Sequence, residues 1–373
     1  MSVDSSSPNP WERGFGYFAG REIAGLALRD LPLPVLVLRE SAVAWNLDVM
    51  ARWCAERGVS LAPHGKTTMA PELIRRQLEA GAWGMTAASV GQLTVMRDAG
   101  ARRVILANQL VGAPEIAWFE REREGIEAYC LVDSVAGVRA LAAGVRRPLR
   151  VLIELGGPRA GCRTVEQALA VADAVAAAPL LELAGVEGFE GTLPAEEVDP
   201  YLGRLRELVE TLAGRGAFGG EIIATAGGSA FFDRVVQALR FSHPVRVVLR
   251  SGCYITHDDG LYAESTPLPE LRAALELWAR VLSCPEPGLA IAGFGKRDAP
   301  YDLGLPVVRS HPGVRVTALN DQHAFLDDPD GALEVGDTVV CGISHPCTAF
   351  DKWPLIGVVD DDDIVVGAVR TRF

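Results

Sequence analysis

A lysine lies at the junction between an expected strand and an expected loop. Lys66 belongs to the stretch APHGKT at residues 62–67, which follows the apolar segment 59–61 and precedes a helical pattern over 70–80. In an α/β barrel the carboxyl ends of the strands carry the catalytic groups. A lysine at this position can therefore act on a substrate, and a surface ion pair at the strand end is its alternative role.

The composition singles out the same residue. The chain has 36 Lys and Arg residues, but only Lys66, Lys296 and Lys352 are lysines. Arginine thus supplies nearly all of the positive charge. A guanidinium stays protonated, whereas a lysine amine can lose its proton and attack a carbonyl carbon. We therefore predict that Lys66 holds pyridoxal phosphate as an imine, with the surface ion pair as the alternative.

A second group of reactive side chains lies near the C-terminus, in the stretch GISHPCT at residues 342–348. His345 and Cys347 are two positions apart, so both side chains lie on one face of an extended backbone. Imidazole and thiolate are ligands of soft divalent ions, zinc above all, and two protein ligands leave positions open for catalysis. For His323 we expect one of three roles: a further metal ligand, a hydrogen-bond partner of a ligand, or a contact to the substrate. The alternative for the pair is a buried cysteine beside a hydrogen-bonded histidine.

Three glycine-containing turns follow expected strands and could bind a cofactor. Residues 156–161 (GGPRAG) present Arg159, while residues 225–229 (TAGGS) and 250–254 (RSGCY) follow the seventh and eighth strands. Barrel enzymes often bind phosphate in these last two loops, at a helix N-terminus. Ser229 would donate its hydroxyl and also act as an N-cap. The alternative is that the two glycines only begin a helix.

These groups need a scaffold that brings strand ends together, and the hydrophobic pattern predicts one. Short apolar segments alternate with helical patterns, which favours a parallel sheet, and eight such units favour a closed barrel. Helices are expected between them, at 165–177, 200–214 and 230–239, and before them at 41–57. The expected barrel strands are 59–65, 84–88, 103–108, 127–132, 150–155, 182–188, 221–226 and 245–250.

The pattern changes after residue 259. A Pro-rich segment at 266–270 resembles a linker, and short apolar runs separated by turns follow it, which favours antiparallel strands. The predicted fold is α/β: a (β/α)8 TIM-like barrel followed by a smaller, mostly antiparallel β domain. The predicted domains are 34–260 for the barrel and 266–373, with part of 1–33, for the β domain.

Composition excludes several classes of protein. The 373 residues are 49% hydrophobic and 23% charged, with a formal net charge of -12, and no basic run suggests a nucleic-acid surface. The N-terminal segment lacks the features of a signal peptide, and no apolar run is long enough for a membrane helix. Seven cysteines without a regular spacing fit reduced thiols in a cytoplasm. We therefore expect a cytoplasmic protein with no membrane and no nucleic-acid partner.

Taken together, the motifs resemble those of the fold-type III pyridoxal phosphate enzymes, specifically the D-serine dehydratase and D-threonine aldolase group with an alanine-racemase-like barrel. The resemblance covers about 34–373. Residues 63–67 (PHGKT) look like the family's Pro-His-x-Lys-Thr, whose lysine holds the cofactor. The resemblance implies that Arg159 meets the phenolic oxygen of the cofactor. It also implies cofactor-binding roles for Gly228, Ser229, Gly252, Cys253 and Tyr254.

The resemblance also implies an activity. The family's dehydratases carry His-x-Cys for zinc and its aldolases carry His-x-Asp for harder ions such as Mn2+, so Cys347 favours a zinc-dependent D-serine dehydratase that forms pyruvate and ammonia. A metal-dependent D-threonine or 3-hydroxy-D-amino-acid aldolase and a non-enzymatic cofactor-binding regulatory protein are the alternatives. A homodimer is implied as well.

The residues expected near the substrate differ more from the family's motifs than those expected near the cofactor. His64, Asn108 and His323 are expected there. Where relatives have Tyr-His at the end of the sixth strand, this chain has Phe189-Glu190.

Overall fold

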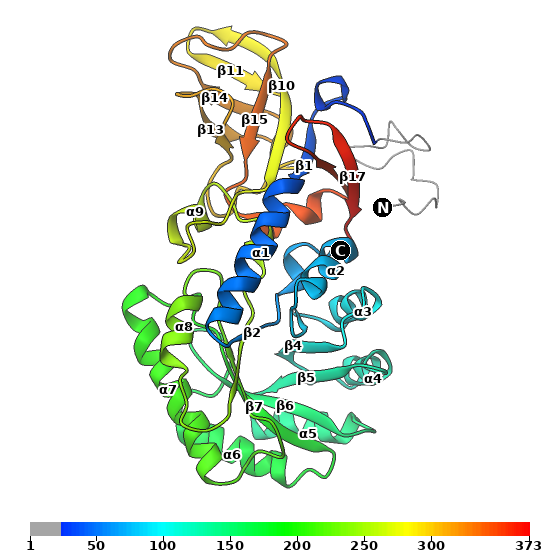
Figure 1. Cartoon of the computed structure of the whole chain (residues 1–373), viewed down its shortest axis with the longest axis vertical. Helices are drawn as coiled ribbons and strands as arrows, with labels where there is room; N and C mark the ends of the chain where they lie inside the picture. Colours follow the sequence, from blue (N-terminus) through cyan, green and yellow to red (C-terminus); the bar gives the residue numbers. More distant parts are fainter. Residues whose placement is uncertain (1–23) are drawn as a thin grey trace. The chain divides into compact units, whose positions relative to one another are not determined.

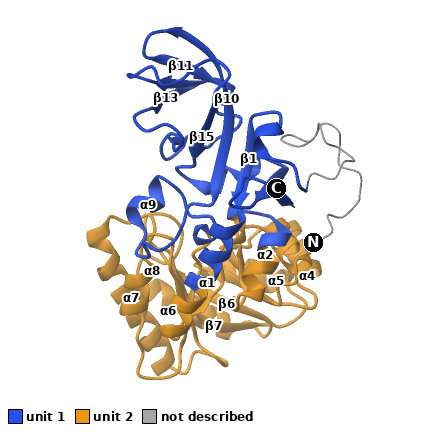
Figure 2. Cartoon of the chain, turned by 45° about the horizontal axis from the view of Figure 1, so that its top comes forward, with its two compact units in different colours: residues 1–50, 67–73, 253–373 blue, residues 51–66, 74–252 orange. Residues whose placement is uncertain are grey.

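The computed structural model of the protein describes residues 24–373. Most of the segment 1–33, part of which is predicted to belong to the β domain, therefore falls outside the described residues. The chain divides into two compact units, drawn in Figure 2, and each is described by itself. Unit 1 takes the chain up to Met50, then Thr67–Leu73 and Cys253–Phe373, and unit 2 takes Ala51–Lys66 and Ile74–Gly252.

Unit 2 contains the predicted alternation of strand and helix (Figure 1). Every predicted barrel strand is present, and seven of the eight lie within two residues of their predicted limits; the first, predicted at 59–65, is reduced to Ser60–Leu61. The strands are β2 (Ser60–Leu61), β3 (Met85–Ala87), β4 (Arg103–Gln109), β5 (Glu127–Val132), β6 (Leu149–Leu155), β7 (Leu181–Gly188), β8 (Ile223–Ala226) and β9 (Arg246–Leu249). The helices are α2 (Pro71–Glu79), α3 (Val90–Asp98), α4 (Ala113–Glu122), α5 (Val135–Gly144), α6 (Val165–Ala176), α7 (Ala195–Gly214) and α8 (Phe232–Ala238).

The strands of unit 2 form a nearly closed parallel barrel. Their order in the sheet is β2-β9-β8-β7-β6-β5-β4-β3. The two end strands approach each other, because His64 forms a parallel bridge with Thr86 and the N–H of Trp83 donates to the carbonyl of Leu61 at 2.8 Å. The predicted α/β barrel is thus confirmed, and the carboxyl ends of its strands lie at one end.

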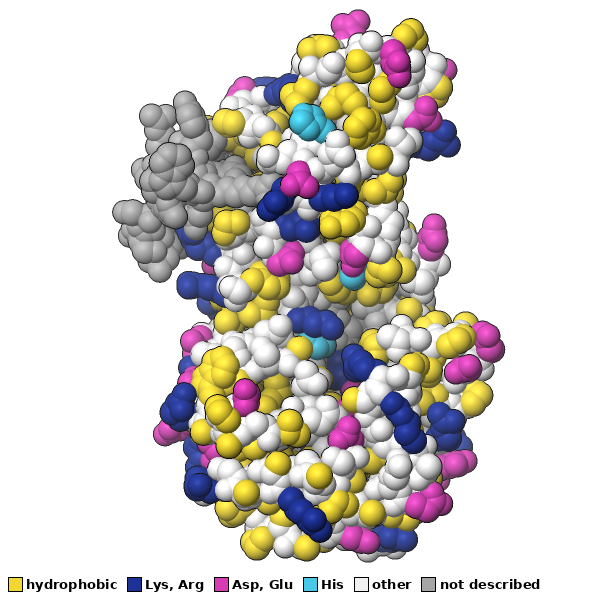
Figure 3. Space-filling model, turned by 180° about the vertical axis from the view of Figure 1, so that it is seen from behind, with side chains coloured by type: hydrophobic (Ala, Val, Ile, Leu, Met, Phe, Trp, Pro, Cys, Tyr) yellow, Lys and Arg dark blue, Asp and Glu magenta, His cyan; other side chains and the backbone are white. Residues whose placement is uncertain are grey.

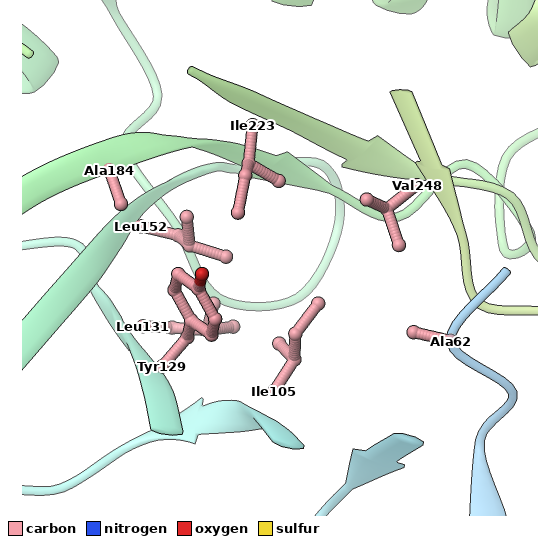
Figure 4. Packing of buried hydrophobic residues seen from close by; sticks show 8 residues of the cluster. All are labelled: Ala62, Ile105, Tyr129, Leu131, Leu152, Ala184, Ile223 and Val248. Carbon is pink, nitrogen blue, oxygen red and sulfur yellow. The ribbon is translucent and has the colours of Figure 1, made fainter. Parts of the chain in front are cut away.

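The barrel interior is filled by apolar side chains from most of its strands (Figure 4). Parallel strands covered by helices bury both of their faces, which explains why their sequences are runs of apolar residues. The cluster consists of Ala62, Ile105, Tyr129, Leu131, Leu152, Ala184, Ile223 and Val248. On the outside, Trp53 in the last part of α1 (Glu40–Glu56) packs edge-on against Phe232 of α8, with ring centroids 4.9 Å apart.

Unit 1 contains a mostly antiparallel sheet, as predicted. The order β13-β14-β11-β10-β1-β16-β17 forms its main path, and β15 pairs with β10 and β12. Among the described strands of this unit, only β1 and β16 pair in parallel. The strands are β1 (Val35–Arg39), β10 (Leu275–Glu286), β11 (Leu289–Ala292), β12 (Val307–Val308), β13 (Arg315–Leu319), β14 (Ala324–Asp327), β15 (Thr338–Gly342), β16 (Leu355–Val359) and β17 (Val365–Arg370). The short helices are η2 (Leu28–Asp30), η3 (Gly65–Thr67), η4 (Cys253–Ile255), α9 (Leu261–Ser265), η5 (Pro346–Thr348) and η6 (Phe350–Lys352).

Two strands of this sheet differ from the sequence analysis. The long strand β10 was not predicted, because its first residues are buried on both faces and it lacks a clear alternation. β1 lies inside the predicted barrel limits of 34–260, yet it pairs with β10 and β16 of unit 1. The limits 34–260 and 266–373 themselves stay a prediction.

A buried carboxylate joins several parts of unit 1. Glu276 of β10 forms an ion pair with Arg39 at 2.6 Å and another with Arg309 at 3.3 Å, and it accepts a hydrogen bond from Trp278 at 3.0 Å. Because each oxygen of Glu276 has a charged or N–H partner, the carboxylate is stable inside the sheet.

The surface carries charges of both signs. On the face drawn in Figure 3, acidic and basic side chains are interspersed. Within residues 24–373, no helix is both long enough and apolar enough to cross a membrane.

The barrel core generates the first prediction. Val248 is fully buried in the interior cluster, whereas Val111 is 62% exposed before α4. We expect Val248→Ala to lower the free energy of unfolding by about 2 kcal/mol, because two methyl groups leave a cavity. Val111→Ala, the matched control, should change it by less than about 0.5 kcal/mol. Urea unfolding followed by circular dichroism measures both, and equal effects would contradict the packing described.

Candidate active site

Lys66 lies at the carboxyl end of β2, in η3. The backbone before it is held on both sides, because the N–H of His64 donates to the carbonyl of Arg250 at 3.0 Å while His64 also bridges to β3. A Cβ atom at Gly65 would lie 2.4 Å from the Cε atom of Met96, so a larger residue there would displace Met96. The side chain of Lys66 is exposed. Lys66 therefore lies where a strand ends and a loop begins, as the sequence predicts.

The neighbouring His64 is a neutral imidazole in positive surroundings. Burial lowers its pKa well below the usual value, and the charges of Lys66, Arg250 and Arg159 lower it further. These three cations belong to different segments of unit 2 and meet near His64. The Nδ1 atom of His64 is buried and has no hydrogen-bond partner within residues 24–373, which leaves it available to a bound molecule.

Arg159 lies in the loop between β6 and α6. The loop is closed by two backbone hydrogen bonds of 2.8 Å, from Gly156 to the carbonyl of Cys162 and from Cys162 to the carbonyl of Glu154. The Arg159 guanidinium lies over the ring of Phe189, 5.0 Å from its centroid. Arg159 therefore belongs to the same end of the barrel as His64.

The glycine loop after β8 binds the carboxylate side chain of Glu190. The N–H groups of Gly227 and Gly228 donate to the two carboxylate oxygens of Glu190, at 3.0 and 2.6 Å. Ser229, by contrast, is not an N-cap. The helix α8 begins three residues later, with Phe231 at the N-cap position, because the glycine turn continues through two further residues. The predicted N-cap at Ser229 is thus wrong.

The loop after β9 supports the glycine loop from its other side. The hydroxyl of Ser251 donates to the carbonyls of Gly227 and Gly228, at 3.1 and 3.0 Å. Gly252 is buried directly after it. The carbonyls of the glycine loop therefore face Ser251, while its N–H groups face Glu190.

A buried acid–base pair at the same end was missed by the sequence analysis. Arg250 forms an ion pair with Glu187 of β7 and donates to the carbonyl of Gly188 at 2.9 Å. Burial raises the pKa of Glu187 to about 7; the charge of Arg250 opposes this rise and that of Glu154 reinforces it. A glutamate near the carboxyl end of β7, at a fully buried position, was the signal available in the sequence.

In unit 1, two cysteines predicted for different roles lie together. The sulfur atoms of Cys253 and Cys347 are 3.2 Å apart, and the hydroxyl of Thr67 lies 3.7 Å from each. Thr67 directly follows Lys66 in the sequence, and Cys253 directly follows Gly252. Tyr254 is buried in η4 beside Cys253.

His345 is oriented by a carboxylate. Its Nδ1 atom lies 2.8 Å from an oxygen of Asp302, and the hydroxyl of Thr348 donates to the other oxygen at 3.1 Å. A metal-binding histidine commonly uses one ring nitrogen for such a partner and the other for the ion. The contact with Asp302 therefore occupies Nδ1 and leaves Nε2 as the ring nitrogen that could bind an ion. Asp302 was not predicted, because no spacing rule connects it to His345.

Two predicted residues, His323 and Asn108, have local contacts of their own. His323 is exposed in the turn between β13 and β14, where its carbonyl accepts from the N–H of Asn320 at 2.9 Å. The amide of Asn108, on β4, donates to the carbonyl of Ala88 at 3.2 Å. The structure does not group His323 with His345 and Cys347: in the described part of the chain, no cluster of three or more His, Cys, Asp or Glu side chains is placed to hold a metal ion.

The side chains and N–H groups described above fit the cofactor and the metal ion that the sequence predicts. The N–H pair that holds the Glu190 carboxylate is suited to a phosphate oxygen pair, and Lys66 is exposed at the same end of unit 2. In unit 1, the thiol of Cys347 and Nε2 of His345 are soft and borderline donors that suit a divalent ion with further ligands from water or substrate.

Comparison with known proteins defines the family. The family described as "Alanine racemase, N-terminal domain" matches residues 38–254, more than half of the chain, and "Putative serine dehydratase domain" matches residues 274–359. The chain belongs to the alanine racemase N-terminal domain family and thus to the fold-type III pyridoxal phosphate enzymes.

Individual relatives span nearly the whole chain. The 3-hydroxy-D-aspartate aldolase of Paracoccus denitrificans (strain Pd 1222) is 25% identical over 384 residues, covering 96% of this chain and 97% of that protein. The crystal structure of D-threonine aldolase from Filomicrobium marinum has a TM-score of 0.82 at 28% identity and covers 93% and 96% of the two chains. The D-threo-3-hydroxyaspartate dehydratase from Delftia sp. HT23 shares the fold at 22% identity, with a TM-score of 0.77 and coverage of 93% and 99%.

The acid–base pair generates a prediction for pH dependence. Because the folded chain raises the pKa of Glu187 from 4.5 to about 7, the native state holds a proton there that the unfolded state has lost. Stability from this group therefore falls as pH rises between these values. Relative to Glu187→Gln, the wild-type apoprotein should lose stability between about pH 5 and about pH 8 in urea unfolding.

The control is Glu182→Gln, which removes a partly exposed carboxylate from the same strand. Its stability difference from the wild type should stay nearly constant over that pH range. A Glu187→Gln difference that is equally constant would contradict the proton assignment.

Proposed function

We propose that this pyridoxal phosphate-dependent lyase removes the hydroxyl group and the α-proton of a β-hydroxy D-amino acid. D-Serine is the first substrate to test, with pyruvate and ammonia as products. The observation that carries the choice of dehydration is the pair His345 and Cys347, whose imidazole and thiol suit zinc, with Asp302 orienting the imidazole.

Lys66 is the residue that would hold the cofactor and move the proton. Its amine is nucleophilic when unprotonated, as the cofactor's aldehyde requires. Pyridoxal phosphate, when bound, supplies an electron sink for negative charge at the substrate's α-carbon. With the substrate's amino group in place of the Lys66 amine, the Nζ atom of Lys66 would be free to take the α-proton. His64 stays neutral beside it, because its pKa lies well below the usual value.

The other proposed residues would bind and orient the cofactor and the substrate. The N–H groups of Gly228 and its neighbours would hold the phosphate group, together with Ser229, Gly252, Cys253 and Tyr254. Arg159 would meet the phenolic oxygen. Asn108 and His323 remain proposed on the substrate side.

A divalent ion held by His345 and Cys347 would polarise the β-hydroxyl so that it leaves more easily. We propose zinc for this chain, because thiolate and imidazole are its preferred ligands.

An aldolase is the second candidate. The relatives named 3-hydroxy-D-aspartate aldolase and D-threonine aldolase favour it. Such an enzyme would use the same ion and hydroxyl but would break the Cα–Cβ bond and release glycine from D-threonine, with Mn2+ as an alternative ion. These relatives are lyases, which favours an enzyme over a non-enzymatic carrier. A homodimer in the cytoplasm remains part of the proposal.

The cofactor assignment is tested by absorbance and product formation together. We expect the reconstituted protein to show a band near ~420 nm from lysine-bound cofactor. Lys66→Ala should lose the band, while Lys296→Ala and Lys352→Ala, which replace the other two lysines, should keep it. D-Serine should yield pyruvate, detected with lactate dehydrogenase and NADH.

The outcomes separate the candidates. A band without pyruvate, but with glycine from D-threonine, would favour the aldolase. A band that survives in Lys66→Ala would contradict the role of Lys66, and no band after reconstitution would refute the cofactor assignment.

The metal assignment gives a separate prediction. Cys347→Ala should abolish tight binding of zinc, and Asp302→Asn should weaken it by about 10–100-fold because His345 loses its orienting carboxylate. Cys284→Ala, which changes an exposed cysteine, is the control and should bind zinc as the wild type does. Zinc content and competition with a chelator measure the affinity. Wild-type affinity in Cys347→Ala would refute the site.

A further inference from the structure

A buried carboxylate occupies the place at which an anion is predicted to bind. Glu190 lies two residues after β7, and its side chain has no exposed surface. Its two oxygens accept hydrogen bonds from the N–H groups of Gly227 and Gly228, at 3.0 and 2.6 Å. One side chain therefore uses both N–H groups that would bind the phosphate of the cofactor.

The glycine loop is shaped for an anion independently of Glu190. Gly227 has a φ of +98°, a conformation that favours glycine. Ser251 holds the two carbonyls from the opposite side, which turns the two N–H groups toward Glu190. A Cβ atom at Gly228 would lie 3.2 Å from the ring of Phe189, so the loop leaves little room for a side chain. The N–H pair is thus preorganised for any ligand with two acceptor oxygens.

We propose that Glu190 is an internal competitor of the phosphate group: its carboxylate holds the Gly227 and Gly228 N–H groups in the free chain and releases them when phosphate binds. The inference rests on the proposed function, since it concerns the cofactor site of that function. Glu190 would thereby lower the affinity of the chain for its cofactor.

Charge and shape both support competition. A carboxylate presents two oxygens with a spacing close to that of two phosphate oxygens, so the same N–H pair suits either. The two anions cannot share the pair, because a second negative charge beside a buried carboxylate is strongly unfavourable. Phosphate must therefore displace Glu190, and part of its binding free energy is lost in doing so. Pyridoxal, which lacks the phosphate group, meets no such competition.

A purely structural role for Glu190 makes the opposite prediction. If the carboxylate only kept the glycine loop in shape, its removal would loosen the loop and weaken phosphate binding. The direction of the change in affinity therefore separates the two roles.

The test compares the wild-type apoprotein with Glu190→Gln. The amide keeps the size of the side chain but removes its charge and one acceptor atom. Glu196→Gln, on the exposed first turn of α7, is the control for the same change in net charge. Inorganic phosphate and pyridoxal phosphate are titrated by calorimetry, pyridoxal by its absorbance band, and the melting temperature checks folding. Glu190→Ala provides a second way to remove the carboxylate if the amide variant does not fold.

We expect Glu190→Gln to bind inorganic phosphate and pyridoxal phosphate at least about tenfold more tightly than the wild type, with pyridoxal and the control unchanged. Unchanged or weaker phosphate binding in a folded variant would overturn the proposal. A failure of the proposed function is recognised separately, because neither chain would then form the lysine-bound band. The inorganic phosphate titration would still decide the role of Glu190.

Discussion

The parallel backbone pairing around the barrel is the constraint on which the position of Lys66 depends. β2 has only two residues, and its continuation is held by the hydrogen bond from His64 to Arg250 on one side and by the bridge to Thr86 on the other. This pairing anchors the backbone immediately before an exposed lysine. Because every strand of the barrel runs in the same direction, the loops with Arg159 and Gly228 reach the same end from distant parts of the sequence.

The interior of the barrel changes character along its axis. Its middle is filled by apolar side chains such as Leu152 and Ile223. At the carboxyl end of the strands the buried groups are ionisable instead, and each has a partner: Glu187 pairs with Arg250, and Glu190 accepts two backbone N–H groups. Buried charges are tolerated when their partners are held in place, so this charged layer is also a rigid one.

The sequence predicted the barrel well because each strand is a short apolar run between turn residues and helical patterns. The antiparallel sheet was predicted less completely, since β10 is buried on both faces at its start and carries Glu276 in the middle of an ion-pair network. Motifs with a local spacing, such as His345-x-Cys347, were found from the sequence. Asp302 and Glu187 were missed because their partners are distant in the sequence and only the fold brings them together.

The use of arginine and lysine in the structure bears on the role of Lys66. Arginines make the buried ion pairs described above, in which a planar guanidinium meets a carboxylate with several donors. Lys296 and Lys352 instead lie near the ring of Tyr301, at 5.4 and 5.9 Å from its centroid. The charges that act on His64 next to Lys66 are all positive. Arg250 is already paired with Glu187, whereas Lys66 is exposed beside a neutral imidazole, which suits a ligand that brings its own negative charge.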